Sequence, residues 1–326
     1  MREPHLRIPS LIGEPVPALR SVDLLTGDHP RRPYPDPHRF RNSIWLRGAV
    51  FIAVLAVAIV LCVSAAAAIV GLPIPTDSLV IPWTELIAAA GSYVVLTFVM
   101  ESRVWPYEIA PRRWLGLLKG ALLGLILVSL CIGVLALTGV YRIDSVNPGY
   151  NPWRDLLVIG LVAAVAEEIL MRGVLFRLVE EGLGTWGAVG VSAIVFGASH
   201  LGNPDATLWG AIAIAIEAGI LFAALYALTR SLWWCIGLHF AWNIAEGPLF
   251  GSVVSGTGAG NSWFGSSWSG PSILTGGQFG LEASIVPVVL LGILGVGLLV
   301  YLQRHKMIVA PIWTRRARLS ATGQQA

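Results

Sequence analysis

Charged side chains are scarce in this chain of 326 residues: Asp, Glu, Lys and Arg make up only 13% of it, whereas 55% of the residues are hydrophobic. A soluble domain carries roughly twice that charged fraction, so the composition excludes an ordinary soluble globular protein. The formal net charge is only +3, and lysine occurs only as Lys119 and Lys306. Charge this weak and scattered also excludes nucleic acid as a partner.

Cysteine is equally rare. Cys62, Cys131 and Cys235 lie in three different apolar runs and show no paired spacing, which excludes a disulfide framework and indicates small core side chains. The His-Glu-x-x-His helix of many zinc proteases is also missing from the sequence.

Long apolar runs are abundant, and a run of about 20 residues is enough to cross a bilayer as a helix. The sequence therefore predicts an all-α membrane protein, a polytopic bundle of about eight transmembrane helices within residues 44–305. A disordered Pro/Arg-rich cytoplasmic tail at 1–43 and a basic cytoplasmic tail at 306–326 are expected to flank it. The predicted spans are 45–70, 82–101, 114–138, 155–181, 186–201, 206–229, 232–249 and 283–303.

The basic residues predict how these spans are oriented. Eight arginines lie at or before Arg47, whereas the alternate connections that would face outward hold only Arg142 and Arg154. Because cytoplasmic loops are rich in Lys and Arg, we expect both termini to face the cytoplasm of a bacterial plasma membrane. The outward connection 250–281 has no charged residue and is expected to be a flexible Gly/Ser loop, with a lid as the alternative.

The segment AEEILMRG at 166–173 places three charges inside an apolar span. On a helix Glu168 and Arg172 are neighbours at i,i+4 and can pair, whereas Glu167 points about 100° away and has no local partner. Each charge in the membrane centre costs roughly 2.5–3.5 kcal/mol, and a buried ion pair recovers little of that. Intramembrane carboxylates therefore indicate function, although a packing pair or a proton relay in a transporter would use the same residues.

Other polar residues share this depth. Phe196 and His200 lie at i,i+4 near the end of the fifth predicted span, and His239 and Asn243 do so on the seventh. Counting about 1.5 Å per residue from each cytoplasmic end, we place Glu167, His200, His239 and Asn243 in one band about 10 Å tall. A carboxylate can activate water, and imidazole and amide N–H groups can stabilise an oxyanion. This combination suits hydrolysis of a peptide bond within the membrane.

The three motifs EExxxR, FxxxH and HxxxN, in this order, resemble those of the CPBP family, which includes the CAAX proteases and is also called the Abi family. The resemblance covers about residues 150–250, the expected catalytic core. The matching residues are Glu167, Glu168 and Arg172, then Phe196 and His200, then His239 and Asn243.

The resemblance implies an eight-span endopeptidase that opens toward the cytoplasm and acts on membrane-associated peptides or lipidated proteins. Glu167 would activate the water with help from His200. The other two residues of the first motif would position this base, and the HxxxN residues would stabilise the oxyanion. The family has also been interpreted as metal-dependent, so zinc is a candidate cofactor, since His and carboxylate ligands suit it.

Two other functions stay open. A proton-coupled transporter would use Glu167, Glu168 and Glu217 as a relay, and a non-catalytic scaffold or immunity protein would need none of the site residues. Glu217 is not explained by the motifs; we expect it to pair with Arg172 or with a glutamate of the fourth span.

Overall fold

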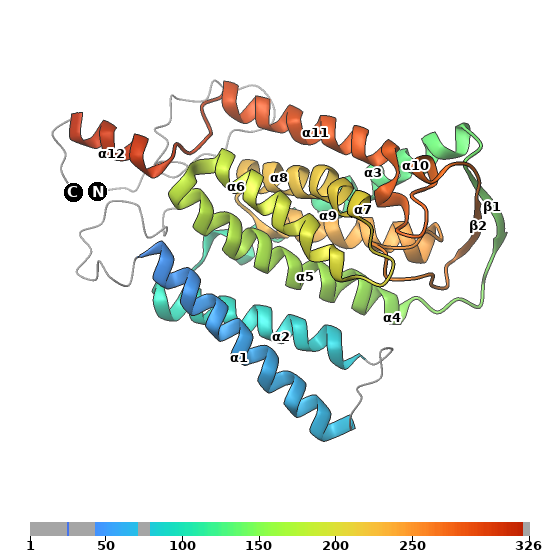
Figure 1. Cartoon of the computed structure of the whole chain (residues 1–326), viewed down its shortest axis with the longest axis horizontal. Helices are drawn as coiled ribbons and strands as arrows, with labels where there is room; N and C mark the ends of the chain where they lie inside the picture. Colours follow the sequence, from blue (N-terminus) through green and yellow to red (C-terminus); the bar gives the residue numbers. More distant parts are fainter. Residues whose placement is uncertain (1–24, 26–42, 71–78, 322–326) are drawn as a thin grey trace.

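Backbone N–H and C=O groups must bond to each other where water is absent, and the apolar runs of this chain accordingly fold as helices. The computed structural model describes residue 25 and residues 43–70 and 79–321, so the predicted tail at 1–43 lies almost wholly outside the described residues. The helices form an elongated bundle in which α1 and α2 lie on one side and α11 on the other (Figure 1). The α-helices are α1 (Ile44–Val70), α2 (Val80–Val94), α3 (Leu115–Leu137), α4 (Trp153–Asp155), α5 (Ala163–Glu168), α6 (Arg177–Ser199), α7 (Leu208–Ile214), α8 (Leu221–Thr229), α9 (Leu232–Ile244), α10 (Ser272–Thr275), α11 (Ile285–Arg304) and α12 (Ile312–Ala321).

Five helices within the described part of the chain are long and apolar enough to cross a membrane. Together with the composition they confirm a helical membrane protein. The predicted spans 155–181, 186–201 and 232–249 are also helical, but they do not meet the same criteria of length, apolarity and low charge. The five are Ile44–Ile69, Val80–Met100, Pro111–Leu137, Leu208–Thr229 and Ile285–Arg304.

Several helices of the bundle contain π-helical turns, in which each hydrogen bond spans one residue more than in an α-helix. Two π-helical segments, Leu156–Val162 and Ile169–Phe176, lie on either side of α5. The helical stretch that continues into α6 is broken at Gly184, whose φ of 75° lies in the left-handed region that favours glycine. This break falls between the fourth and fifth predicted spans.

Helices α3 and α9 approach each other through glycine. A Cβ atom on Gly120 would lie 2.1 Å from the carbonyl oxygen of Trp234, and a Cβ on Gly237 would lie 2.1 Å from that of Leu117. No side chain larger than hydrogen fits at either position, so the two backbones are in direct contact, as is common between membrane helices. This contact fixes α9, the helix that carries the HxxxN motif.

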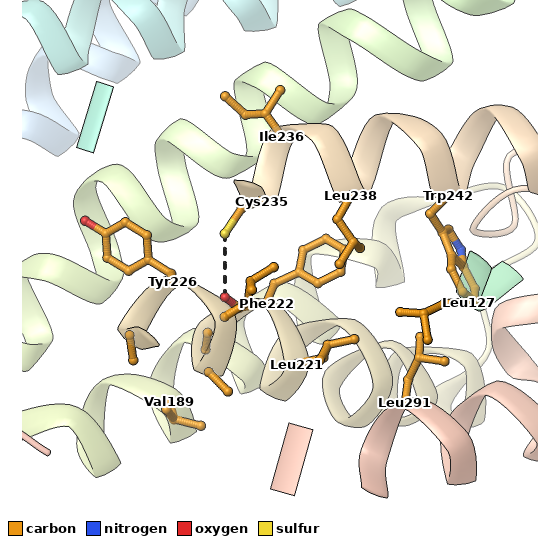
Figure 2. Close-up of a cluster of buried hydrophobic side chains, with 14 of the residues drawn as sticks. Leu127, Val189, Leu221, Phe222, Tyr226, Cys235, Ile236, Leu238, Trp242 and Leu291 are labelled. Carbon is orange, nitrogen blue, oxygen red and sulfur yellow. Dashed lines mark hydrogen bonds between the residues drawn. The ribbon is translucent and has the colours of Figure 1, made fainter. Parts of the chain in front are cut away.

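Apolar side chains fill the space between α8, α9 and their neighbours (Figure 2). Phe222 and Leu238 are buried there, and the thiol of Cys235 donates a 3.7 Å hydrogen bond to the carbonyl of Phe222. Cys131 and Cys235 are buried free thiols, whereas Cys62 is partly exposed. The two buried thiols are thus core side chains, as the sequence predicted.

A small antiparallel sheet closes one end of the bundle, opposite the end at which α12 lies (Figure 1). It joins β1 (Tyr141–Val146) to β2 (Phe264–Trp268), with Tyr141 opposite Trp268 and a bulge between Ile143 and Ser145. The ring of Tyr141 packs edge-on against that of Trp268 at 4.9 Å.

The prediction that 250–281 is a flexible loop is therefore wrong. Besides β2, this connection contains α10 and the buried side chains of Phe279 and Leu281. The physical reason is that it pairs with β1, a segment from another connection, which a local interpretation of the sequence could not supply.

A buried ion pair stabilises the connection between α2 and α3. Arg103 donates to both carboxylate oxygens of Glu108, and the Tyr93 hydroxyl donates to Oε1 at 2.8 Å. Burial alone would raise the pKa of Glu108, but the charge and hydrogen bonds of Arg103, together with the nearby charge of Arg177, outweigh burial and lower the pKa from 4.5 to about 2. The folded state therefore favours the ionised carboxylate.

We expect the stability that this carboxylate provides to be lost in acid. A pKa lower in the folded than in the unfolded state contributes stability above the unfolded value, here about 3 kcal/mol at pH 7. This contribution disappears as the pH falls from about 5 to about 2. The measurement is the unfolding free energy of wild type and Glu108→Gln in detergent across this range. The free-energy difference between the two proteins should shrink as the pH falls. The control Asp144→Asn, at an exposed position, should have the unfolding free energy of the wild type throughout. A constant difference for Glu108→Gln would contradict the prediction.

Candidate active site

The EExxxR segment brings a buried ion pair to the centre of the bundle. Glu168 and Arg172 are fully buried, and Nη1 of Arg172 donates to Oε1 of Glu168 at 2.9 Å, as their spacing predicted. Nδ1 of His239 lies 3.1 Å from the same oxygen. Because an ionised carboxylate can only accept, Nδ1 of His239 carries a proton.

Aromatic rings and backbone carbonyls fix Arg172. Its guanidinium lies over the rings of Phe196 and Phe222, at 4.9 and 5.1 Å from their centres, a favourable position for a cation. Its Nη2 also lies within hydrogen-bond distance of the carbonyls of Ala218 and Gly219, at 3.3 and 3.5 Å. The carboxylate of Glu168, the two rings and the two carbonyls thus hold Arg172 in one position.

Glu167 points away from this pair, as its position on the helix predicts. Its side chain is 33% exposed, and its Oε2 lies 4.0 Å from Nε2 of His239. This separation is too long for a direct hydrogen bond. Among the described residues, Oε2 is itself buried and has no hydrogen-bond partner, which leaves it as an acceptor beside the imidazole.

His200 lies just after the end of α6. Its Nδ1 is 2.7 Å from the carbonyl oxygen of Phe196, and the two rings meet edge-on at 4.9 Å. A carbonyl only accepts, so Nδ1 carries the proton and Nε2 of the neutral ring is left as an acceptor. The FxxxH spacing thus fixes both the orientation and the tautomer of this histidine.

Asn243 and both histidines border one small cavity. One amide N–H of Asn243 donates to the carbonyl of Ile159 at 3.0 Å, which leaves the other N–H free to bind a ligand. The cavity lining is Phe196, His200, Glu217, Ala218, Phe222, His239, Trp242, Asn243, Ser255, Glu282 and Leu291.

His239 joins two groups of predicted site residues. On one side it contacts Glu168 and lies next to Glu167; on the other it borders the cavity together with His200 and Asn243. The cavity lining includes neither glutamate of the EExxxR motif. The six predicted catalytic residues are therefore arranged around the imidazole of His239 and do not all line one cavity.

Our expectation for Glu217 is not supported. Arg172 pairs with Glu168, and no described residue forms a hydrogen bond with Oε2 of Glu217. Its acidic neighbours are instead Glu246 and Glu282. Glu246 follows His239 by seven residues and therefore shares its helix face. Glu282 has no such signal in the sequence beyond its place at the start of an apolar span.

The residues present do not fit a zinc site. The described residues include no group of three or more His, Cys, Asp or Glu side chains that could hold a metal ion. Oε1 of Glu168 already accepts from Arg172 and His239, so this oxygen is not available as a metal ligand. Metalloprotease chemistry is therefore not supported, and we derive no step through a metal.

The fold and the cluster define a class: an integral membrane protein with a carboxylate, two imidazoles and an amide gathered inside its helices. Residues 149–245 match the family model described as type II CAAX prenyl endopeptidase Rce1-like. The matched segment includes all three motifs, so the resemblance predicted from them is confirmed, and it supports an intramembrane endopeptidase of the CAAX-protease type. No curated protein and no solved structure matches the chain.

Proposed function

We propose that this protein is an intramembrane endopeptidase in which Glu167 activates the water that hydrolyses a peptide bond. The observation that carries the proposal is the free Oε2 of Glu167, 4.0 Å from Nε2 of His239. Two polar atoms at this separation can share a water. A carboxylate oxygen that accepts no other hydrogen bond is well suited to take a proton from this water.

In the proposed reaction Glu167 takes a proton from the water, and the water oxygen bonds to the carbonyl carbon of the substrate. The carbonyl oxygen then becomes negatively charged and needs hydrogen-bond donors. Carboxylates beside both ring nitrogens of His239 favour its imidazolium form, in which Nε2–H is a donor. The free N–H of Asn243 is a second donor, and Glu167 finally returns the proton to the leaving amine.

Glu168 and Arg172 have a positioning role in this proposal. The carboxylate of Glu168 fixes the ring of His239 through Nδ1, and Arg172 fixes the carboxylate. Preorganised donors act strongly because they need not move during the reaction. The rings and carbonyls around Arg172 therefore support the geometry at His239, two contacts away.

We further propose that eight helices cross the membrane with both termini in the cytoplasm, from where a membrane-associated or lipidated substrate enters. The supporting observations are the arginine-poor outward connections and the position of α12 at the same end of the bundle as the start of α1 (Figure 1). A prenylated CAAX protein is the substrate that the family match suggests.

The test uses the full chain, purified and reconstituted in lipid nanodiscs. It is incubated with two peptides of one CAAX sequence, prenylated and not prenylated, and the products are identified by mass spectrometry. We expect cleavage of the prenylated peptide at a single bond, unchanged after removal of divalent metals with a chelator. Intact peptides under every condition would overturn the proposal, and activity that chelation abolishes and zinc restores would overturn its metal-free mechanism.

One observation favours the alternative of a proton-coupled transporter: Glu217, Glu246 and Glu282 are all buried in the bundle. A transporter would move protons across liposomes when a solute gradient is imposed. We expect no such flux, since these residues have a different role in the proposal that follows.

A further inference from the structure

Three buried glutamates lie behind the proposed site, on three separate segments of the chain. Glu217, Glu246 and Glu282 are 1%, 0% and 5% exposed, and both other carboxyl groups lie within electrostatic range of Glu217. Among the described residues, none of the ion pairs includes one of these three glutamates. An apolar interior does not stabilise three neighbouring carboxylates that have no direct ion-pair partner. At least one therefore carries a proton.

Hydrogen bonds distinguish two of the three carboxyl groups from the third. Glu246 accepts the indole N–H of Trp242 at 2.9 Å and the hydroxyl of Ser252 at 3.5 Å. Glu282 accepts the hydroxyl of Ser255 at 2.7 Å. Donors directed at a carboxylate favour its ionised form, so these two groups have compensation for a negative charge.

Glu217 has no such compensation. Its Oε2 is buried and accepts no hydrogen bond from the part of the chain that the structure describes, although the side chain borders the same cavity as Glu282 and His200. Without a donor, the protonated form is the favoured one, and its O–H needs an acceptor. Glu217 is therefore the acid of the group.

His200 supplies an acceptor across this cavity. Its Nδ1–H is used by the carbonyl of Phe196, which leaves the lone pair of Nε2. The cavity is also bordered by the polar side chains of Asn243 and Ser255, and a polar cavity with several such groups is suited to hold a water. An acid and a base thus line one small cavity in which polar groups are placed to bind a water.

We propose that Glu217 passes a proton to His200 through a water in this cavity during peptide-bond hydrolysis and recovers it when the product leaves. The proposal rests on the proposed function. The O–H bond of Glu217 breaks and an N–H bond forms on His200, while the intervening water gives up one proton and gains another; nothing is oxidised or reduced. The resulting imidazolium adds a positive charge next to the oxyanion when the negative charge develops.

Glu217 is a positioning residue in this scheme, since it acts only through His200. Its role depends on pH: the protonated form is required, so the rate should fall as rising pH removes this proton. The titratable and charged groups around Glu217 are His200, His239, Glu246, Glu282, Cys131 and Arg172.

The decisive variant is Glu217→Gln, because glutamine keeps the shape and an N–H donor of the neutral acid but cannot release a proton. With the peptide assay described above, we expect kcat about 100-fold lower with KM unchanged. The remaining kcat should not decrease at alkaline pH, because no carboxyl proton is left to lose. Glu217→Asp should restore part of kcat together with its decrease at alkaline pH, which we call the alkaline fall. The matched control is Glu246→Gln, a buried glutamate that does not border the cavity, and it should keep the alkaline fall.

Infrared difference spectroscopy gives a readout that needs no substrate. The wild type should show the C=O band of a protonated carboxyl group, and Glu217→Gln should lack it. Wild-type kcat and pH profile in Glu217→Gln, or a protonated-carboxyl band that persists in it, would overturn this inference alone. If the wild type cleaves no peptide, the proposed function fails, and the relay to His200 fails with it.

Discussion

Glu167→Gln should lower kcat/KM about 1,000-fold at pH 7, within the range that a general base contributes, while the protein stays folded. Glutamine fills the same space, but its amide cannot take a proton from water. Among the described residues, the ion-pair partner of the Glu167 carboxylate is His239, 4.0 Å away, so the substitution breaks no close ion pair. The measurements are kcat/KM with the prenylated peptide and the melting temperature in detergent, which we expect to change little.

The matched control is Glu85→Gln on α2. Glu85 is an exposed carboxylate within electrostatic range of Glu167, but it makes no contact with His239 among the described hydrogen bonds. Its loss should change kcat/KM by less than about threefold, because Glu85 acts on Glu167 only as a distant charge. If Glu167→Gln keeps more than a tenth of the activity, Glu167 is not the base.

Arg172→Met should destabilise the protein by about 3–5 kcal/mol, because it removes one partner of the buried ion pair with Glu168. It also removes the group held between Phe196 and Phe222. Thermal unfolding in detergent measures the effect. As a control, Arg142→Met removes an exposed guanidinium 3.6 Å from Asp144 on β1, and should cost no more than about 1 kcal/mol.

A double substitution separates stability from catalysis. Arg172→Met combined with Glu168→Gln removes the uncompensated charge, so much of the lost stability should return. Activity should not return, because His239 then lacks the carboxylate that holds its Nδ1. A double variant as unstable as Arg172→Met alone would mean that packing around the guanidinium, rather than its charge, determines the stability.

Much of the bundle could be predicted from local sequence alone. Apolar runs mark helices directly, because the bilayer tolerates few alternatives, and the i,i+4 rule predicted the pair Glu168–Arg172 that the structure contains. The position of His239 beside Glu167 could be inferred from depth, since each helix rises a fixed distance per residue.

Features that depend on distant contacts could not be predicted in this way. β1 is a short, mostly polar segment that pairs with β2 across more than 100 residues of chain, so neither strand has a strong local signal. Glu217, Glu246 and Glu282 are far apart in sequence, and they meet only because their segments fold onto one another. The π-helical turns around α5 shift the helix face by one residue without a clear compositional signal.

The contact between α3 and α9 has a consequence for the matched segment 149–245. α3 lies outside that segment, yet its backbone is what α9 rests on at Gly120 and Gly237. The height of the histidine within the bilayer is therefore set by main-chain geometry supplied from elsewhere in the chain. Grafting residues 149–245 onto a different scaffold would transfer the reactive groups but not the backbone contact with α3 that positions them.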